Sequence, residues 1–117
     1  GHIKEALDAF NRYEADKTDT GISPMTIHKA LALYLSGSEM DATQLVHSAM
    51  KLLKDESNDL LYRISIGIEL IDYMLQTGNI EQAEKLIDQL HGLLEELPDS
   101  MQEPYNTRIV AIRQAQN

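Results

Sequence analysis

Apolar residues recur along most of the chain at the three- and four-residue spacing of amphipathic α-helices, and no stretch of strict apolar–polar alternation stands out. Six such stripes predict helices at about residues 2–16, 24–36, 39–54, 58–77, 79–97 and 102–115. Short polar segments separate them. The pair Ser23-Pro24, for example, provides a helix N-cap and a proline suited to the first helical position. Connections this short favour antiparallel neighbours, so we expect one all-α domain over residues 1–117.

The expected core follows the apolar stripes of the helices. In the fourth helix it comprises Leu60, Leu61, Ile64, Ile68, Ile71 and Leu75. In the fifth helix it comprises Ile80, Ala83, Leu86, Ile87, Leu90, Leu94 and Leu97. Ser38 or Asp41 is the expected cap of the third helix.

A glycine precedes an alanine by five residues at three places. The pairs are Gly1 with Ala6, Gly37 with Ala42 and Gly78 with Ala83. A glycine can end a helix in the left-handed conformation and turn the chain tightly. An alanine one turn into the next helix lets two backbones approach closely. The pattern therefore predicts an internal helix–turn–helix repeat, with periods of 36 and 41 residues.

The repeat resembles the tetratricopeptide repeat, and the segment from Tyr73 to Ala83 (Tyr-Met-Leu-Gln-Thr-Gly-Asn-Ile-Glu-Gln-Ala) is the best match. The resemblance implies an α-α superhelix in which the second, fourth and sixth helices line a concave groove. Its longer period is similar to that of divergent arrays in bacterial regulatory proteins. The chain departs from the family pattern in having no tryptophan, in the bulky Ile71 and in the position of Pro98. The alternative is an unrelated helical bundle.

The charge balance limits the classes of partner. Ten basic and nineteen acidic side chains give a net charge of −9, which argues against binding to nucleic acid or to anionic membranes. No apolar run is long enough for a membrane span. The chain has no cysteine, and a cytoplasmic location fits this best. Because the sequence begins with Gly-His rather than Met, we expect it to be a piece of a larger protein.

The acidic charge is distributed unevenly over the predicted helices. The first, third and fifth helices with their trailing loops total −10, whereas the second, fourth and sixth total +1. In a tetratricopeptide-like array this distribution implies an acidic convex back and a nearly neutral groove. A solvated face that carries glutamate for solubility explains the same pattern.

Signals for chemistry are weak throughout the sequence. The histidines form none of the usual metal-binding spacings, and no phosphate-binding loop or nucleophile motif occurs. Asp88 and His91 lie three residues apart, but a third ligand is missing. We therefore expect a protein that is not an enzyme and that carries no cofactor or metal.

The leading hypothesis is a protein–protein interaction module of a regulatory or signalling protein that docks a partner helix or peptide in the groove. The candidate groove residues are Tyr62, Arg63, Asp72, Tyr73 and Gln76. A second hypothesis is a homodimer formed through the end helices. The candidate residues for this contact are Ile3, Leu7, Phe10, Ile109 and Ile112. A third is a helical accessory domain of an enzyme.

Overall fold

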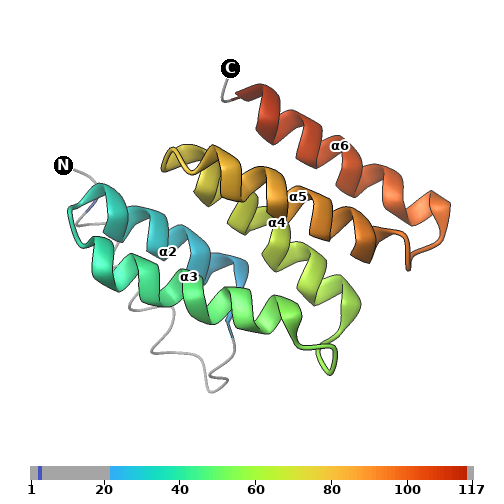
Figure 1. Cartoon of the computed structure of the whole chain (residues 1–117), viewed down its shortest axis with the longest axis horizontal. Coiled ribbons are helices and arrows are strands. Elements are labelled where there is room, and N and C mark those ends of the chain that lie inside the picture. Colours follow the sequence, from blue (N-terminus) through green and yellow to red (C-terminus); the bar gives the residue numbers. More distant parts are fainter. Residues whose placement is uncertain (1–2, 4–21, 116–117) are drawn as a thin grey trace.

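The computed structural model describes Ile3 and residues 22–115. The longer segment, 22–115, consists of helices joined by short loops (Figure 1). The helices are α2 (Pro24–Leu35), α3 (Glu39–Lys54), α4 (Leu60–Gln76), α5 (Ile80–Leu94) and α6 (Asp99–Ala115). No strand occurs between residues 22 and 115, which confirms the all-α class. The predicted helix 2–16, with the candidates Leu7 and Phe10, lies outside the described residues apart from Ile3, which is helical.

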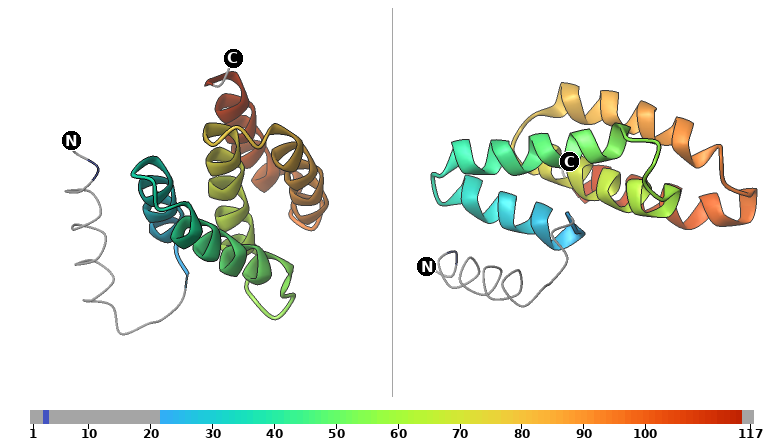
Figure 2. Two further views of the ribbon diagram at one scale, coloured as in Figure 1. Left: turned by 60° about the vertical axis from the view of Figure 1, so that its left-hand side comes forward. Right: turned by 90° about the horizontal axis from the view of Figure 1, so that it is seen from below.

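The five helices form two layers, with α2, α4 and α6 in one and α3 and α5 in the other (Figure 2). Helix α4 lies at the centre and packs against α2, α3, α5 and α6. Eleven of its 17 residues are buried as a result. An amphipathic surface helix buries one stripe, whereas a helix surrounded by neighbours is apolar on most sides. The core of the domain is therefore organised around α4.

The helix bounds agree with those expected from the sequence to within about three residues, and Ser23 and Ser38 are the N-caps of α2 and α3. The prediction that Leu61 and Ile80 are core residues is wrong, because their side chains are 37% and 50% exposed. Both lie at the first turn of a helix, where the neighbouring helices do not cover them. Further along α4 the core is larger than expected, because the packed neighbours also bury Ile66, Leu70 and Met74.

The two glycine turns have the predicted left-handed conformation. Gly37 has φ +95° and Gly78 has φ +85°. The N–H of Ser38 donates to the carbonyl of Leu33, and the N–H of Asn79 donates to that of Met74, each at 2.8 Å. This bond from the residue after the glycine back to the helix is the one that closes a Schellman motif. Each turn thus satisfies carbonyls that the helix end leaves free.

The similarity between the two helical hairpins extends well beyond the turns, at a constant offset of 41 residues. Ile27, Ile68 and Ile109 are separated by this offset and are 2%, 0% and 2% exposed in α2, α4 and α6. Further pairs at the same offset are buried or half-buried in α3 and α5: Ala42 and Ala83, Val46 and Ile87, Ala49 and Leu90, Leu53 and Leu94. The two alanines that follow the glycines are fully buried, as the pattern predicts.

A third glycine allows the two layers to come together at α4. A Cβ atom placed on Gly67 would lie 2.7 Å from Cδ1 of Leu90 in α5 and 3.3 Å from Cδ1 of Leu53 in α3. The first distance is shorter than any ordinary carbon contact. Gly67 therefore leaves room for the leucines of both outer helices over the middle of α4.

The loop between α3 and α4 satisfies the polar groups at the adjacent helix ends. The side-chain amide of Asn58 donates to the carbonyl of Leu52 at 3.1 Å, and the Asp59 carboxylate caps α4 by accepting from the N–H of Tyr62. The hydroxyl and the backbone N–H of Ser57 donate to Asp55, and together they hold the pKa of that exposed carboxyl below its usual value. These local bonds fix the direction in which α4 leaves α3.

The same substitution at two glycines should have opposite effects on stability. Gly78→Ala places a Cβ on a left-handed residue and should lower the free energy of unfolding by about 1–2 kcal/mol. Gly92→Ala lies within α5, has open space around its Cβ and should raise it by about 0.5–1 kcal/mol. Urea unfolding followed by circular dichroism measures both. If Gly78→Ala left the free energy of unfolding unchanged, that result would argue against the left-handed turn.

Candidate partner-binding face

One stripe of α4 points out of the core on the side of α2 and α6. Its members recur at the three- and four-residue spacing of a single helix face. They are Tyr62, Ser65, Glu69, Asp72 and Gln76. All of them except the buried Glu69 are half-buried or exposed. We call the surface formed by this stripe with the adjoining sides of α2 and α6 the α2–α4–α6 face.

A buried carboxylate lies at the centre of this face. The side chain of Glu69 is 7% exposed, and its Oε2 lies 3.2 Å from Nε2 of His28 in α2. Its Oε1 accepts a hydrogen bond from Nη2 of Arg108 in α6. A buried carboxylate is costly unless its oxygens are paired, and here each oxygen has a separate partner. Glu69 therefore joins the three helices of the layer through polar contacts.

Three of the five predicted groove residues lie on this stripe: Tyr62, Asp72 and Gln76. Gln76 is exposed, and its side-chain amide donates to Oδ1 of Asp72 at 3.0 Å. Asp72 and Tyr62 are half-buried. These side chains offer polar groups and one aromatic ring at the surface. The fold therefore brings these three predicted residues onto one face.

Arg63 and Tyr73 are placed differently from what the sequence analysis expected, because both side chains are buried. Nε of Arg63 donates to the carbonyl of Leu53 at 2.9 Å, and the positive charge lies at the C-terminal end of α3, where the helix dipole favours it. The ring of Tyr73 packs edge-to-face against Tyr34 with centroids 6.3 Å apart. Each residue follows a stripe member by one position, which turns its side chain about 100° round the helix towards a packed neighbour.

The cluster of Glu69, His28 and Arg108 was not predicted from the sequence. One signal was present: Glu69 is the single charge between Ile64 and Ile71, a segment that apart from Ser65 is otherwise apolar. A charge at such a position has to find partners, since acidic residues are almost never fully buried unpaired. Its partners lie 41 residues earlier and 39 residues later in the chain, and only the packing of α4 between α2 and α6 brings them together.

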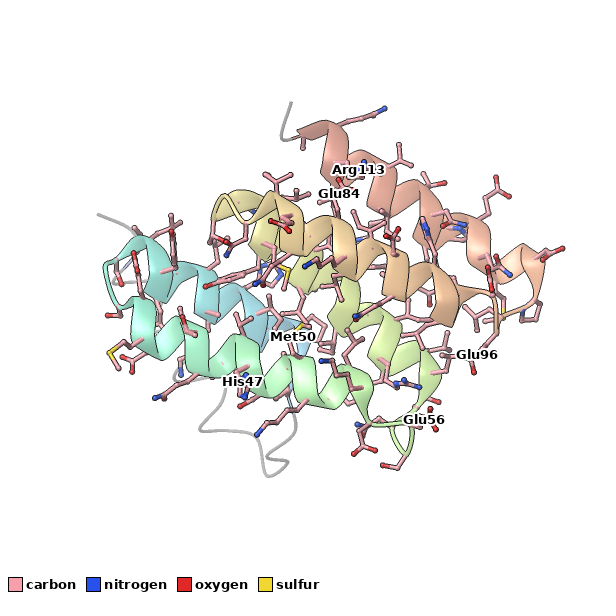
Figure 3. The ribbon with its side chains drawn as sticks, in the orientation of Figure 1. His47, Met50, Glu56, Glu84, Glu96 and Arg113 are labelled. Atoms are coloured by element: carbon pink, nitrogen blue, oxygen red, sulfur yellow. The ribbon has the colours of Figure 1, made fainter. Side chains whose placement is uncertain are left out.

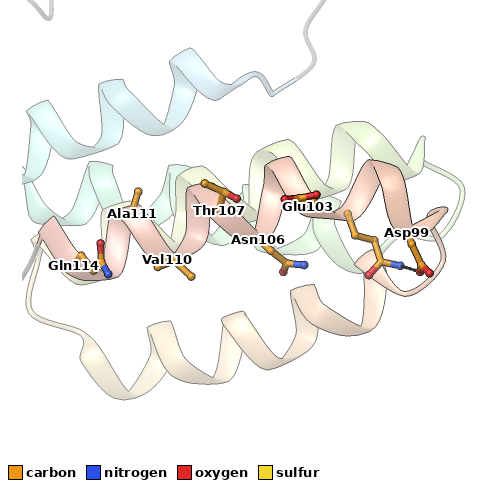
Figure 4. A pocket seen from close by; sticks show the side chains of 8 residues that line it. Asp99, Glu103, Asn106, Thr107, Val110, Ala111 and Gln114 are labelled. Atoms are coloured by element: carbon orange, nitrogen blue, oxygen red, sulfur yellow. Dashed lines mark hydrogen bonds between the residues drawn. The ribbon is translucent and has the colours of Figure 1, made fainter.

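Two of the five residues proposed for self-association pack within the fold. Ile109 is 2% exposed and Ile112 is half-buried, and both belong to the core around α4. Ile3 is 36% exposed. The open side of α6 instead carries Thr107, Val110 and Ala111 along a shallow hollow of about 560 Å³ (Figure 4). Every residue that lines this hollow belongs to α6, so it is an uncovered helix side rather than a cavity between elements.

Acidic side chains dominate the surface of the other layer. The exposed acidic residues of α3, α5 and the loops that follow them are Glu39, Asp41, Asp55, Glu56, Asp59, Glu81, Asp88, Glu95 and Glu96. Figure 3 shows Glu56 and Glu96 at the ends of this layer, away from α2. The α2–α4–α6 face carries charges of both signs, with His28, Glu69 and Arg108 at its centre. The two sides of the domain therefore differ in charge.

Neither a metal site nor a membrane span is found in the described part of the chain. No three His, Cys, Asp or Glu side chains lie together in a way that could hold a metal ion. None of the helices in the same residues has the length and apolar character needed to cross a bilayer. Comparison with known protein families, with curated proteins and with solved structures found no match.

The packing of Tyr73 should be visible in the dependence of stability on pH. Burial raises the pKa of the Tyr73 phenol above its usual value, and the nearby Tyr34 and Glu39 contribute smaller increases. The folded state therefore holds this proton more tightly than the unfolded state. The stability that results is fully present below pH of about 10 and is lost as the pH rises through the raised pKa.

Urea unfolding at a series of alkaline pH values tests this expectation by comparing the wild type with Tyr73→Phe. The variant has no phenol at this position, so it should flatten the alkaline loss of stability. Equal slopes in the wild type and in Tyr73→Phe would contradict the prediction.

Proposed function

We propose that this chain is a non-catalytic protein-interaction module, similar to tetratricopeptide repeats, that docks a partner helix or extended peptide on the α2–α4–α6 face. One observation carries the proposal. The three helices of this layer lie side by side and place residues 41 positions apart, such as Ile27, Ile68 and Ile109, in equivalent buried positions. Their outer sides therefore form one continuous surface, which is the feature that helical-repeat proteins use for binding.

The contacts between helices support the likeness to a repeat array. Each hairpin, α2 with α3 and α4 with α5, packs internally, and α4 also packs against both helices of the hairpin before it. Helix α6 packs against α4 in turn. In repeat proteins each unit likewise contacts its sequence neighbours. A place in a larger regulatory or signalling protein of the bacterial cytoplasm is part of the same proposal.

The chemistry of the face favours a partner with both apolar and polar groups. Leu35 at the end of α2 is 58% exposed and Leu31 is half-buried, so apolar contact is available beside the polar stripe of α4. Helix-in-groove recognition uses apolar anchors at helical spacing, with polar groups that set the orientation. The acidic layer of α3 and α5 keeps the opposite side solvated.

A pair of matched double variants tests the proposal. Asp72→Lys with Gln76→Lys changes the α2–α4–α6 face, and Asp88→Lys with Gln89→Lys makes the same chemical change on the exposed side of α5. Neither should alter the free energy of unfolding by more than about 1 kcal/mol. Peptides selected against the wild type from a displayed library should lose at least about tenfold in affinity for the first variant only, a change of about 1.4 kcal/mol.

The control variant makes the result interpretable. Peptides that lose affinity for Asp88→Lys with Gln89→Lys, and keep it for the first variant, would place the binding surface on the α3–α5 layer and contradict the proposal. Failure to select any peptide with an affinity better than about 1 mM, a binding free energy of about −4 kcal/mol, would do the same.

A further inference from the structure

Helix α6 is attached to the rest of the domain in a different way from the other helices. Only Ile109 among its 17 residues is buried, whereas α5 buries five of 15 and α4 eleven of 17. Its main contact is with α4, and Val110 on its open side is 52% exposed. Since burial of apolar surface is the main stabilising term in folding, α6 gains less from packing than its neighbours do.

Two ion pairs also attach α6 to the other helices. Nη2 of Arg113 lies 3.1 Å from Oε1 of Glu84 in α5, with both side chains about half exposed (Figure 3). Exposed pairs of this kind contribute little to stability. The pair of Arg108 with Glu69 differs because the carboxylate is only 7% exposed. Removing the cation from a buried carboxylate is costly, so this pair opposes the departure of α6 much more strongly.

The internal structure of α6 adds a second weakness. Pro104 lies inside the helix and has no N–H, so the carbonyl of Ser100 lacks its usual partner four residues later. In proteins most of the stability of a helix comes from the packing of its apolar face rather than from its own propensity. Helix α6 therefore depends on its contacts with α4 and α5 to remain helical, and its backbone amides should lose protection when it leaves.

The second partner of Glu69 lowers the cost of leaving this carboxylate without Arg108 when α6 detaches. His28 belongs to α2, and its Nε2 lies 3.2 Å from Oε2 of Glu69, the oxygen that Arg108 does not contact. The carboxylate would also gain access to water on the side that α6 vacates. The two hairpins can therefore keep Glu69 paired without α6.

We propose that α6 can detach from helices α2 to α5 as a separate unit and that its ion pair with Glu69 holds it in place. Loss of the Arg108–Glu69 pair then uncovers the side of α4 beneath α6, while both hairpins remain folded. This inference does not rest on the proposed function, because α6 can detach whether or not the α2–α4–α6 face binds a partner. Regions that open locally have few buried apolar contacts and exposed hydrogen bonds, as α6 does.

Hydrogen–deuterium exchange of the full chain, resolved by peptide, tests the inference. In the wild type the amides of α6 should exchange faster than those of α4. Arg108→Gln and Glu69→Gln should each accelerate the amides of α6 by at least about tenfold and leave those of α2 to α5 unchanged. Two controls alter neighbouring contacts: Arg113→Gln removes the exposed pair with Glu84, and His28→Gln changes the contact of Glu69 with α2. Each should accelerate α6 by less than about threefold.

The pattern across the variants decides between the alternatives. If α4 and α6 exchange at the same rate in the wild type, and all helices accelerate together in Arg108→Gln, then α6 belongs to a single cooperative unit and the inference is wrong. If Arg113→Gln accelerates amide exchange in α6 as much as Arg108→Gln does, the pair with Glu69 is not what holds α6 in place. If Glu69→Gln loses its fold, Arg108→Gln decides the question, because that side chain is 56% exposed and its removal leaves no cavity.

Discussion

The packing of α4 against four other helices is the constraint on which the rest of this structure depends. A helix buried on most sides has few places for a polar group, and each one present has to be satisfied by another element. Arg63 is satisfied by the C-terminal carbonyl of α3, and Glu69 by His28 of α2 and Arg108 of α6. Gly67 has no side chain, and this leaves room for Leu53 and Leu90 over α4. The positions of the outer helices follow from these demands.

The same constraint explains why the face proposed for binding exists. Because α3 and α5 both cover α4 from one layer, the stripe from Tyr62 to Gln76 emerges between α2 and α6 in the other. Glu69 lies in the middle of that stripe and is withdrawn from solvent by its two partners. What a partner would meet is therefore set by the residues on either side of the cluster, among them Asp72 and Leu35.

The parts of the fold that could be predicted from the sequence are those decided by neighbouring residues. The caps at Ser23 and Ser38 and the left-handed Gly37 and Gly78 depend on local backbone chemistry, and the structure agrees with each. The burial of Arg63 and Tyr73 depends instead on which helices lie beside α4, and the stripe pattern alone does not contain that information. The Glu69 cluster was hidden for the same reason, since its members come from three helices.

The attachment of α6 proposed above and the face proposed for binding both include Glu69, so the two proposals are linked thermodynamically. A partner that spans α2, α4 and α6 contacts α6 only in its docked position, so it binds one of the two states of that helix. Binding to one state shifts the population towards it by the difference in affinity, and detachment of α6 must weaken partner binding by the same factor. Protection of the α6 amides would therefore increase with occupancy of the face, although the apolar core of the two hairpins remains the same in both states.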